Sequence, residues 1–330
     1  MRKKVSQGSA LPIVLWILAI LFIISMSFPF VIGSRIKSME MLFNRFNAHL
    51  KTYSSLQYGM NLLLTGTMGS AQLLSSDLGP FPDGNRYFLD GSFVPIDLFN
   101  GETELSFQEE SGLVNLRLFQ QELIDGLMKY FGADQESRAI FFDSLMDWVD
   151  SDDLVRLHGA EKDYYENLGY RPRNDMVLTP DEILLIKGME EEIFQKIRPF
   201  IFLGKSGGLN PNTALFEVLM SLPDMTEAGA REVLEYRRTN PITSVLSFSS
   251  VCKIDYTFYE SLFDFGRPNL IYKLKARTKL GKDVTYTMEC HVQKIYGPPI
   301  TIEDFLDEIS SLMPEKWAPI KILLFREIIE

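Results

Sequence analysis

Residues 11–32 read LPIVLWILAILFIISMSFPFVI, and no residue between Lys4 and Arg35 carries a charge. As an α-helix, this run is long enough to cross the roughly 30 Å hydrocarbon core of a bilayer. The basic residues 2–4 precede it, and this bias predicts a cytoplasmic N-terminus with the bulk of the chain on the far side of the membrane. We therefore expect a transmembrane or filament-core helix over residues 9–33. A secretory signal has a shorter apolar stretch.

An amphipathic pattern follows the apolar run. From Ile36 to Leu63, apolar residues recur at steps of three and four among polar residues, which is the spacing of one face of an α-helix. We expect the N-terminal helix to continue to about residue 64, with its second half packed against a globular head.

The composition limits the partners and the chemistry. The 330 residues carry a net charge of -11, which argues against a protein that grips nucleic-acid phosphates or anionic lipid headgroups. The two cysteines, Cys252 and Cys290, are too few for a disulfide scaffold and lack the spacing of a zinc site. One bridge and two separate buried thiols both remain open.

Strand-like segments flank a long helical middle. Residues 93–96 and 103–108 precede it, and residues 269–278 and 283–293 follow it as a predicted hairpin. The predicted helices of the middle cover residues 116–130, 135–150, 179–185, 190–200, 212–222 and 226–239.

These segments predict an α+β fold with a small antiparallel sheet. The head has two parts, residues 34–112 and 251–300, and a large all-α domain over residues 113–250 is inserted between them. A C-terminal helical tail is expected over residues 301–330, with its helix at Ile302 to Met313.

Residues 209–239 have the outline of a helix-hairpin-helix unit. In DNA-repair proteins such a unit holds the phosphate backbone, usually with basic residues nearby. This copy carries five acidic residues against three arginines, so we interpret it as a structural hairpin that binds no nucleic acid.

Candidates for catalysis are missing from the sequence. The histidines His49, His158 and His291 are scattered, and neither cysteine lies in a nucleophile motif. The glycines around Lys205 do not form a phosphate-binding loop. We predict that the protein is not an enzyme.

An acidic cluster lies near the middle of the chain. Its members are Asp147, Asp150, Asp152, Asp153, Glu161, Asp163 and Glu166. Calcium binds six to eight oxygen ligands, often several carboxylates from one loop, but the spacing here is not that of an EF-hand. The residues by themselves leave open a solvated acidic loop and a calcium site.

The N-terminus resembles type IV prepilins and pseudopilins. In that family a short basic leader ends in a glycine, here Gly8, after which a prepilin peptidase cuts, so that residues 1–8 are the leader and the mature chain starts at Ser9. Most members carry a glutamate at the fifth mature position, where this chain has Ile13. The K subunit of type II secretion systems is the pseudopilin that typically lacks this glutamate.

The inserted domain carries a more specific resemblance. The strings are SGLVNLR at 111–117, LMDWVDSDD at 145–153, HGAEKDYYENLGYRPRND at 158–175, LTPDEILLIKGM at 178–189 and GGLNPNTALFEVLMSLPDM at 207–225. In this order they resemble the general secretion pathway protein K family, the minor pseudopilin K of type II secretion systems. The resemblance implies a pilin-like head and calcium binding in the inserted domain. The ligands it favours are Asp150, Asp152, Asp153, Glu161 and Asp163, with Glu182 as a distant candidate.

The resemblance also implies a function. Such a subunit lies at the tip of a periplasmic pseudopilus with the minor pseudopilins I and J, and is anchored in the bacterial inner membrane by one helix. It helps to initiate assembly on the inner-membrane platform for the export of folded proteins. Two alternatives stay open: a minor pilin of a type IV pilus or DNA-uptake system, and an unprocessed single-pass anchored binding protein.

Overall fold

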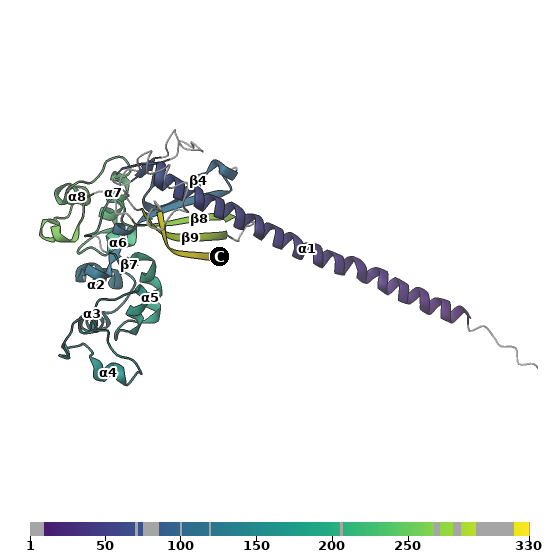
Figure 1. The fold of residues 1–330 in the computed structure, drawn as a ribbon, viewed down its shortest axis with the longest axis horizontal. Coiled ribbons are helices and arrows are strands. Elements are labelled where there is room, and N and C mark those ends of the chain that lie inside the picture. Colours follow the sequence, from purple (N-terminus) through teal and green to yellow (C-terminus); the bar gives the residue numbers. More distant parts are fainter. Residues whose placement is uncertain are drawn as a thin grey trace, which may run out of the picture.

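A long helix, an antiparallel sheet and a helical unit make up the molecule (Figure 1). The computed structural model describes residues 10–69, 72–74, 86–99, 101–118, 120–204, 207–266, 271–279, 285–294 and 320–329. The predicted α+β fold is confirmed. The predicted processing residues Gly8 and Ser9 lie outside the described residues.

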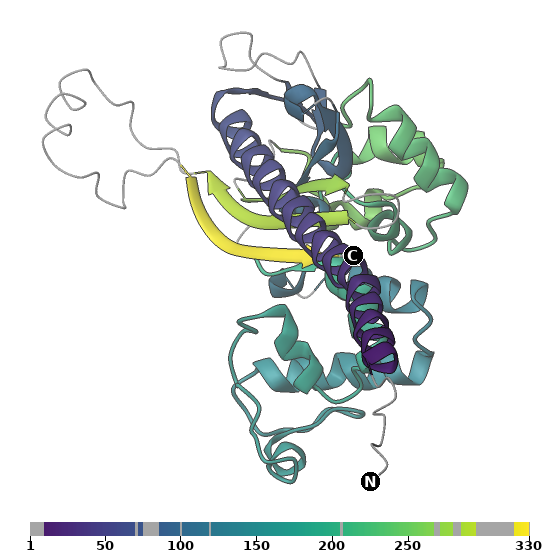
Figure 2. The ribbon, with the colours of Figure 1, turned by 90° about the vertical axis from the view of Figure 1, so that its right-hand side faces the viewer.

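Helix α1 runs from Ala10 to Thr65, so the helix predicted to end near residue 64 is confirmed. Its C-terminal half crosses one face of the main sheet (Figure 2). Gly59 permits this approach, since a Cβ there would lie 2.9 Å from the Leu274 side chain. The Thr52 hydroxyl donates to the Thr278 hydroxyl at 2.7 Å and fixes the helix along the strand.

The N-terminal half of α1 extends away from the head (Figure 1). Its large apolar side chains from Leu11 to Met26 are exposed along the whole of this stretch. Among the described residues, no helix combines the length and the apolar character needed to cross a membrane.

The main sheet has five antiparallel strands in the order β10-β9-β8-β5-β4. Their bounds are Asp90–Ile96 for β4, Thr103–Glu109 for β5, Ile271–Lys279 for β8, Thr285–Lys294 for β9 and Ile320–Ile329 for β10. A second, three-stranded sheet consists of β1 at Thr67–Met68, β2 at Gln72–Leu74 and β3 at Arg86–Phe88. All four predicted strand segments are therefore present.

The prediction of a helical tail over residues 301–330 is wrong for its last part. Residues 320–329 form β10, which pairs antiparallel with β9 from Ile320 opposite Lys294 to Ile329 opposite Tyr286. The sequence IKILLFREII is rich in β-branched isoleucine, and pairing supplies partners to the edge of β9. The predicted helix at Ile302 to Met313 lies outside the described residues.

The helical unit occupies the chain between β5 and β8. Its α-helices are α2 at Gln121–Tyr130, α3 at Gln135–Val149, α4 at Lys162–Glu166, α5 at Glu191–Ile197, α6 at Phe216–Met220, α7 at Glu227–Tyr236 and α8 at Val245–Cys252. The unit also contains 3-10 segments: η2 at Glu110–Gly112, η3 at Leu116–Leu118, η4 at Pro180–Leu185, η5 at Arg198–Phe200 and η6 at Thr257–Leu262. It is completed by a parallel strand pair, β6 at Val114–Asn115 and β7 at Ile201–Phe202. The 3-10 segments η3 and η4 replace the start of the helix predicted from 116 and the whole of that predicted from 179.

The predicted end of the inserted domain at residue 250 is too early. Phe248, Tyr256 and Phe263 pack in one aromatic cluster, with ring centroids 5.3 Å apart for Phe248 and Tyr256 and 4.9 Å apart for Phe248 and Phe263. The buried core of the helical unit therefore extends to Phe263. The head resumes only with β8, whose buried residues join a separate core with α1, β5 and β9.

The two cysteines lie in different cores. Cys252 is buried in the core of the helical unit and Cys290 in the core of the head, and both are free thiols. Of the two possibilities that the sequence left open, the structure has the two separate thiols.

A buried ion pair joins the helical unit to the head. Arg237, at the end of α7, is only 3% exposed, and its Nη2 lies 2.7 Å from the Asp90 carboxylate at the start of β4. Its Nη1 donates to the carbonyl oxygens of Pro211 and Ala214 at 3.0 and 2.5 Å. The guanidinium thus contacts a largely buried carboxylate and two buried carbonyl groups at once.

Replacing Arg237 with Met should lower the free energy of unfolding by about 3–5 kcal/mol, because two buried carbonyl groups lose their donor and the largely buried Asp90 carboxylate keeps only its bonds from Ser92. Urea denaturation followed by circular dichroism measures this change. Arg231→Met, which removes an exposed pair with Glu227 and a guanidinium contact with the Phe216 ring, should cost less than about 1 kcal/mol. Equal losses for the two variants would contradict a joining role for Arg237.

Candidate metal centre

The acidic residues lie on the loop between α3 and α4. The Asp134 carboxylate caps the start of α3 by accepting from the Ser137 backbone N–H at 2.9 Å. Asp150 is the C-terminal cap of α3, and its N–H still donates to the Met146 carbonyl at 3.1 Å. Glu161 is the residue before α4. The ends of two helices thus hold the two ends of the acidic loop.

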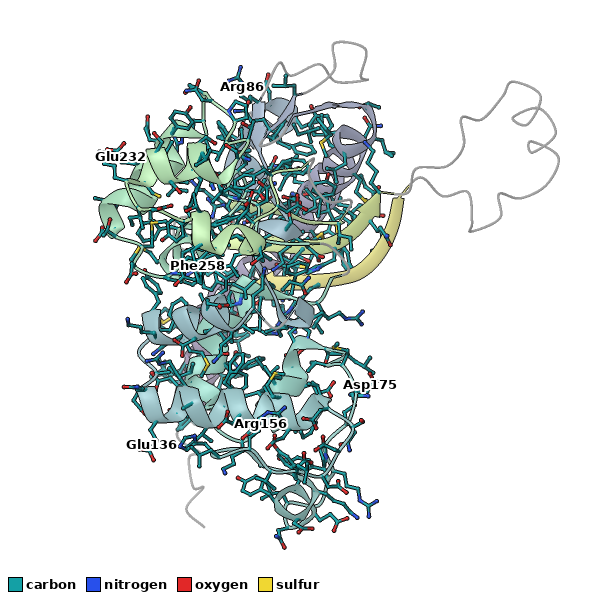
Figure 3. All side chains as sticks on the ribbon, turned by 90° about the vertical axis from the view of Figure 1, so that its left-hand side faces the viewer. Arg86, Glu136, Arg156, Asp175, Glu232 and Phe258 are labelled. Carbon is teal, nitrogen blue, oxygen red and sulfur yellow. The ribbon has the colours of Figure 1, made fainter. Side chains whose placement is uncertain are left out.

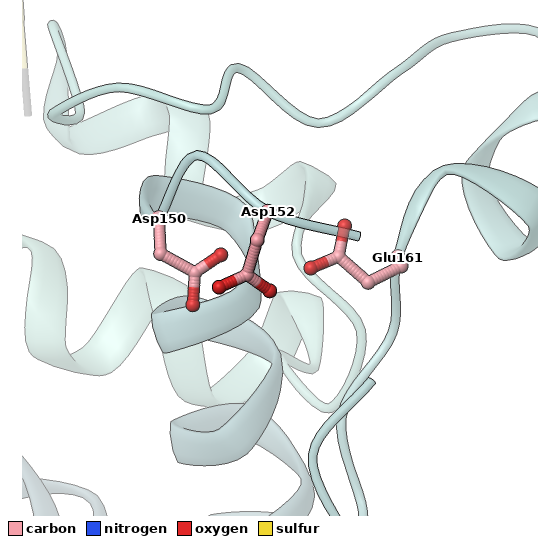
Figure 4. Close-up of side chains that lie close together, drawn as sticks. All are labelled: Asp150, Asp152 and Glu161. Carbon is pink, nitrogen blue, oxygen red and sulfur yellow. The ribbon is translucent and has the colours of Figure 1, made fainter. Parts of the chain in front are cut away.

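Three carboxylates converge on one point. Asp150, Asp152 and Glu161 each offer an oxygen, and these oxygens all lie within 4.8 Å of one another (Figure 4). Asp150 and Asp152 come from the end of α3, whereas Glu161 approaches from the start of α4. The loop between them turns back on itself to make the cluster.

Arg156 and Asp147 organise the turn of this loop. The Arg156 Nη1 lies 2.6 Å from an Asp147 oxygen and 2.6 Å from an Asp150 oxygen, and the Arg156 backbone N–H donates to Asp147. Asp147 is fully buried in α3. A Cβ at position 159 would lie 1.9 Å from the Asp147 carboxylate, so only glycine fits there. Gly159 lets the backbone pass directly over this ion pair.

Several oxygens of the cluster are buried without a partner. Glu161 is 4% exposed, and within the described residues neither of its carboxylate oxygens has a hydrogen-bond partner. The Asp150 Oδ1 is in the same situation, while its Oδ2 contacts Arg156. A buried carboxylate without a donor or a cation is costly, and such groups in a folded protein call for an explanation.

The environment of Glu161 disfavours its charged form. Burial raises the pKa of Glu161, and the negative charges of Asp147, Asp150 and Asp153 raise it further, to about 7. A cation would reverse this effect because it stabilises the ionised carboxylate. Hard oxygen donors from carboxylates match calcium or magnesium in kind. The residues therefore fit a divalent cation.

The structure brings together three of the five predicted ligands. The Asp153 carboxylate lies outside the group of three, but its charge acts on Glu161. Asp163 is exposed on the first turn of α4, and its carboxylate is also outside the group. Their roles as ligands stay predictions.

Glu182, the distant candidate, serves a different network. Its carboxylate accepts from the Trp148 indole N–H at 3.0 Å, from the Arg173 guanidinium at 2.5 Å and from the Leu178 N–H at 3.0 Å. Its oxygens are occupied by these donors, which hold the loop before η4 against α3.

The roles of Arg156, Asp147 and Gly159 could not be predicted from spacing. The sequence shows Arg156 only as a counter-charge within an acidic stretch. The histidine-glycine pair at 158–159 was the available signal for a close backbone approach, since glycine inside a loop often marks one.

Comparison with known proteins finds a family profile that matches the first part of the helical unit. Residues 105–204, which include the whole acidic loop, match the family profile described as type II secretion system (T2SS), protein K. Over this stretch the chain is similar to the type II secretion system protein K family. Relatives include a putative type II secretion system protein K of Escherichia coli (strain K12), 30% identical over 130 residues, 36% of this chain and 39% of that protein.

Two further relatives are named type II secretion system protein K. That of Klebsiella pneumoniae is 28% identical over 32% of this chain and 36% of its own length, and that of Aeromonas hydrophila is 26% identical over 34% and 37%. The chain thus matches less than two fifths of the length of these relatives. The crystal structure of the GspK-GspI-GspJ complex from enterotoxigenic Escherichia coli has 14% identity and a TM-score of 0.47, over 89% of this chain and 98% of that chain.

Replacing Glu161 with Gln should stabilise the metal-free protein at pH 8 by roughly 1–3 kcal/mol. A raised carboxyl pKa contributes stability that is present below the unfolded pKa and lost as the pH rises through the folded value of about 7. The difference in free energy of unfolding between the variant and the wild type should therefore become smaller towards pH 5. Urea denaturation in chelator at both pH values measures it, with Glu235→Gln as an exposed control. The same difference at pH 5 and pH 8 would contradict the raised pKa.

Proposed function

We propose that this protein is a minor pseudopilin that occupies the tip of a type II secretion pseudopilus and helps to initiate its assembly. Its partners in this proposal are the minor pseudopilins I and J and the inner-membrane assembly platform. The filament would drive folded proteins across the outer membrane. The role is mechanical and involves no catalysis by this chain.

The position of the helical unit carries the proposal. Strands β5 and β8 are neighbours in the sheet, and the family-matched unit leaves the head between them. It lies to the side of α1 and the sheet (Figures 1 and 2). Helices that pack side by side are only about 8–10 Å apart, so a body of this size at every position would crowd a filament built around α1. At the end of a filament the crowding is absent.

The first half of α1 supports an anchored, helix-bundled state. Its exposed apolar side chains need a lipid or protein environment, because exposed contiguous apolar surface of this extent is unusual on a monomer in water. We place this half of the helix in the inner membrane before assembly, with the head in the periplasm. Cleavage by a prepilin peptidase after Gly8 belongs to the same proposal, and the mass of the mature N-terminus measures it.

Ile13 supports the tip position. Its side chain is 56% exposed near the start of α1, where most members of the pilin family place a glutamate for a neighbouring N-terminal amine. An unpaired amine in an apolar helix bundle is costly. A subunit without this carboxylate fits best where no subunit lies ahead of it.

Calcium at the acidic loop is part of the proposed function. Asp150, Asp152 and Glu161 would hold the ion, with Asp153 and Asp163 as further ligands from the same loop. When bound, calcium would neutralise the repulsion among these carboxylates. The chain itself contributes the folded loop. In this loop Arg156 pairs with Asp147 and with one oxygen of Asp150, so these oxygens are not among those left to bind the ion.

Calcium at one hundred times its Kd should stabilise the detergent-solubilised protein by about 2.7 kcal/mol, because it binds only the folded state. Thermal melting with and without chelator should show a higher Tm with calcium. Asp150→Asn combined with Glu161→Gln should abolish the shift, whereas the matched charge change Glu136→Gln with Glu235→Gln should leave it intact. If calcium left the Tm of the wild-type protein unchanged, the loop would be a solvated acidic segment and not a calcium site.

Deleting the chain should reduce secretion and pseudopilus initiation. Cysteines placed at exposed positions of α1, such as Met39 and Phe43, should cross-link to other pseudopilins in cells and give single heterologous products. The native thiols of Cys252 and Cys290 are buried, so we expect them not to cross-link in this experiment. A regular ladder of self-multimers would show that the subunit repeats along the filament, and the tip position would then be wrong.

A further inference from the structure

A pocket of about 510 Å³ opens between α2 and the hairpin formed by α6 and α7. Its apolar part comes from the hairpin and consists of Met220, Leu222, Pro223 and Met225. This pocket lies between the helix-hairpin-helix unit and α2, and it shares no residue with the cluster of Asp150, Asp152 and Glu161. Its volume is in the range of small-ligand sites.

The floor of the pocket is held in place by close backbone contacts. A Cβ on Gly126 of α2 would lie 1.9 Å from the Ser221 carbonyl oxygen, so the two backbones touch. The Tyr256 hydroxyl donates to the Pro223 carbonyl at 2.6 Å and fixes the hairpin turn from behind. The pocket is therefore formed without a ligand.

The rim of the pocket is acidic. It includes Glu122 and Asp125 on α2 and Asp224 in the hairpin turn, against the one lysine of the lining, Lys129. Asp125 already pairs with the Arg138 guanidinium from α3. Glu122 and Asp224 are exposed and have no ion pair or hydrogen bond from their side chains within the described part of the chain.

An arginine side chain matches this combination. Its planar guanidinium can donate to two carboxylates, and its three-carbon stem can lie on the apolar floor. The exposed ring of Tyr130, 41% exposed on the pocket wall, offers a face on which a guanidinium can stack. The thioether groups of Met220 and Met225 adapt to an irregular ligand. Nucleic-acid phosphates, the usual ligands of such a hairpin, are disfavoured by the Asp224 carboxylate in the turn.

We propose that this pocket binds an arginine side chain from an extended segment of a partner protein. Glu122 and Asp224 receive the guanidinium, and the hairpin methionines cover its stem. The binding is independent of calcium and of the tip position, because none of the residues involved belongs to the acidic loop or to α1.

The test uses the full chain in detergent micelles with 13C-labelled methionine methyl groups, titrated with N-acetyl-L-arginine methylamide. We expect saturable shifts of the Met220 and Met225 methyl signals, assigned by the Met220→Leu and Met225→Leu variants, while methionines elsewhere stay unchanged. N-acetyl-L-glutamine methylamide, which lacks the charge, should bind at least tenfold more weakly.

Glu122→Gln with Asp224→Asn should weaken arginine binding at least tenfold. Asparagine is chosen because residue 224 has a φ of 58°, a left-handed conformation that asparagine tolerates. The control is Glu136→Gln with Glu235→Gln, which makes the same charge change at two residues that do not line the pocket; Glu136 lies in the first turn of α3 (Figure 3). Absent shifts, equal binding of the glutamine compound or equal affinity of the pocket and control variants would each overturn the proposal.

Discussion

The pairing of β5 with β8 is the constraint on which the rest of the structure depends. Glu109 ends β5 opposite Tyr272 near the start of β8, and the whole helical unit lies between these two positions in sequence. Glu109 is fully buried, and its carboxylate accepts from the Ser111 hydroxyl, from the Asn210 amide at 3.2 Å and from the Thr213 hydroxyl at 2.5 Å. Charge-assisted bonds of this kind are what permit a buried carboxylate. They also tie the strand end to the segment before α6.

The two units keep separate apolar cores and share polar contacts. The head buries one face of α1 against the sheet, and the helical unit buries its residues around α2, α3 and α7. Between them lie Glu109 and the ion pair of Arg237 with Asp90. Polar contacts have stricter geometry than apolar ones, so a joint of this kind sets the orientation of one unit on the other.

The sequence predicted the elements that have local causes. The apolar run and the spacing after Ile36 predicted α1, and the alternation of apolar and polar residues predicted β8 and β9. Strand β10 was missed because its partner β9 stabilises it through tertiary pairing. The aromatic residues between 248 and 263 show no helical or strand periodicity in the sequence, because they pack as one cluster around Phe248. Their place in the helical unit could therefore not be predicted. In the acidic loop, composition indicated carboxylates, but the orphaned oxygens of Glu161 follow from the path of the loop over Asp147, which no spacing encodes.

The insertion between two adjacent strands also has an evolutionary consequence. Because β5 and β8 pair whether a short turn or a large domain connects them, the length and sequence of the connection are free to change without altering the strand order. Head and insertion can then diverge at different rates within one gene. Sequence similarity should persist longest in the unit whose contacts have the stricter geometry. Here the residues that match the family profile, 105–204, begin within β5 and lie mostly in the insertion.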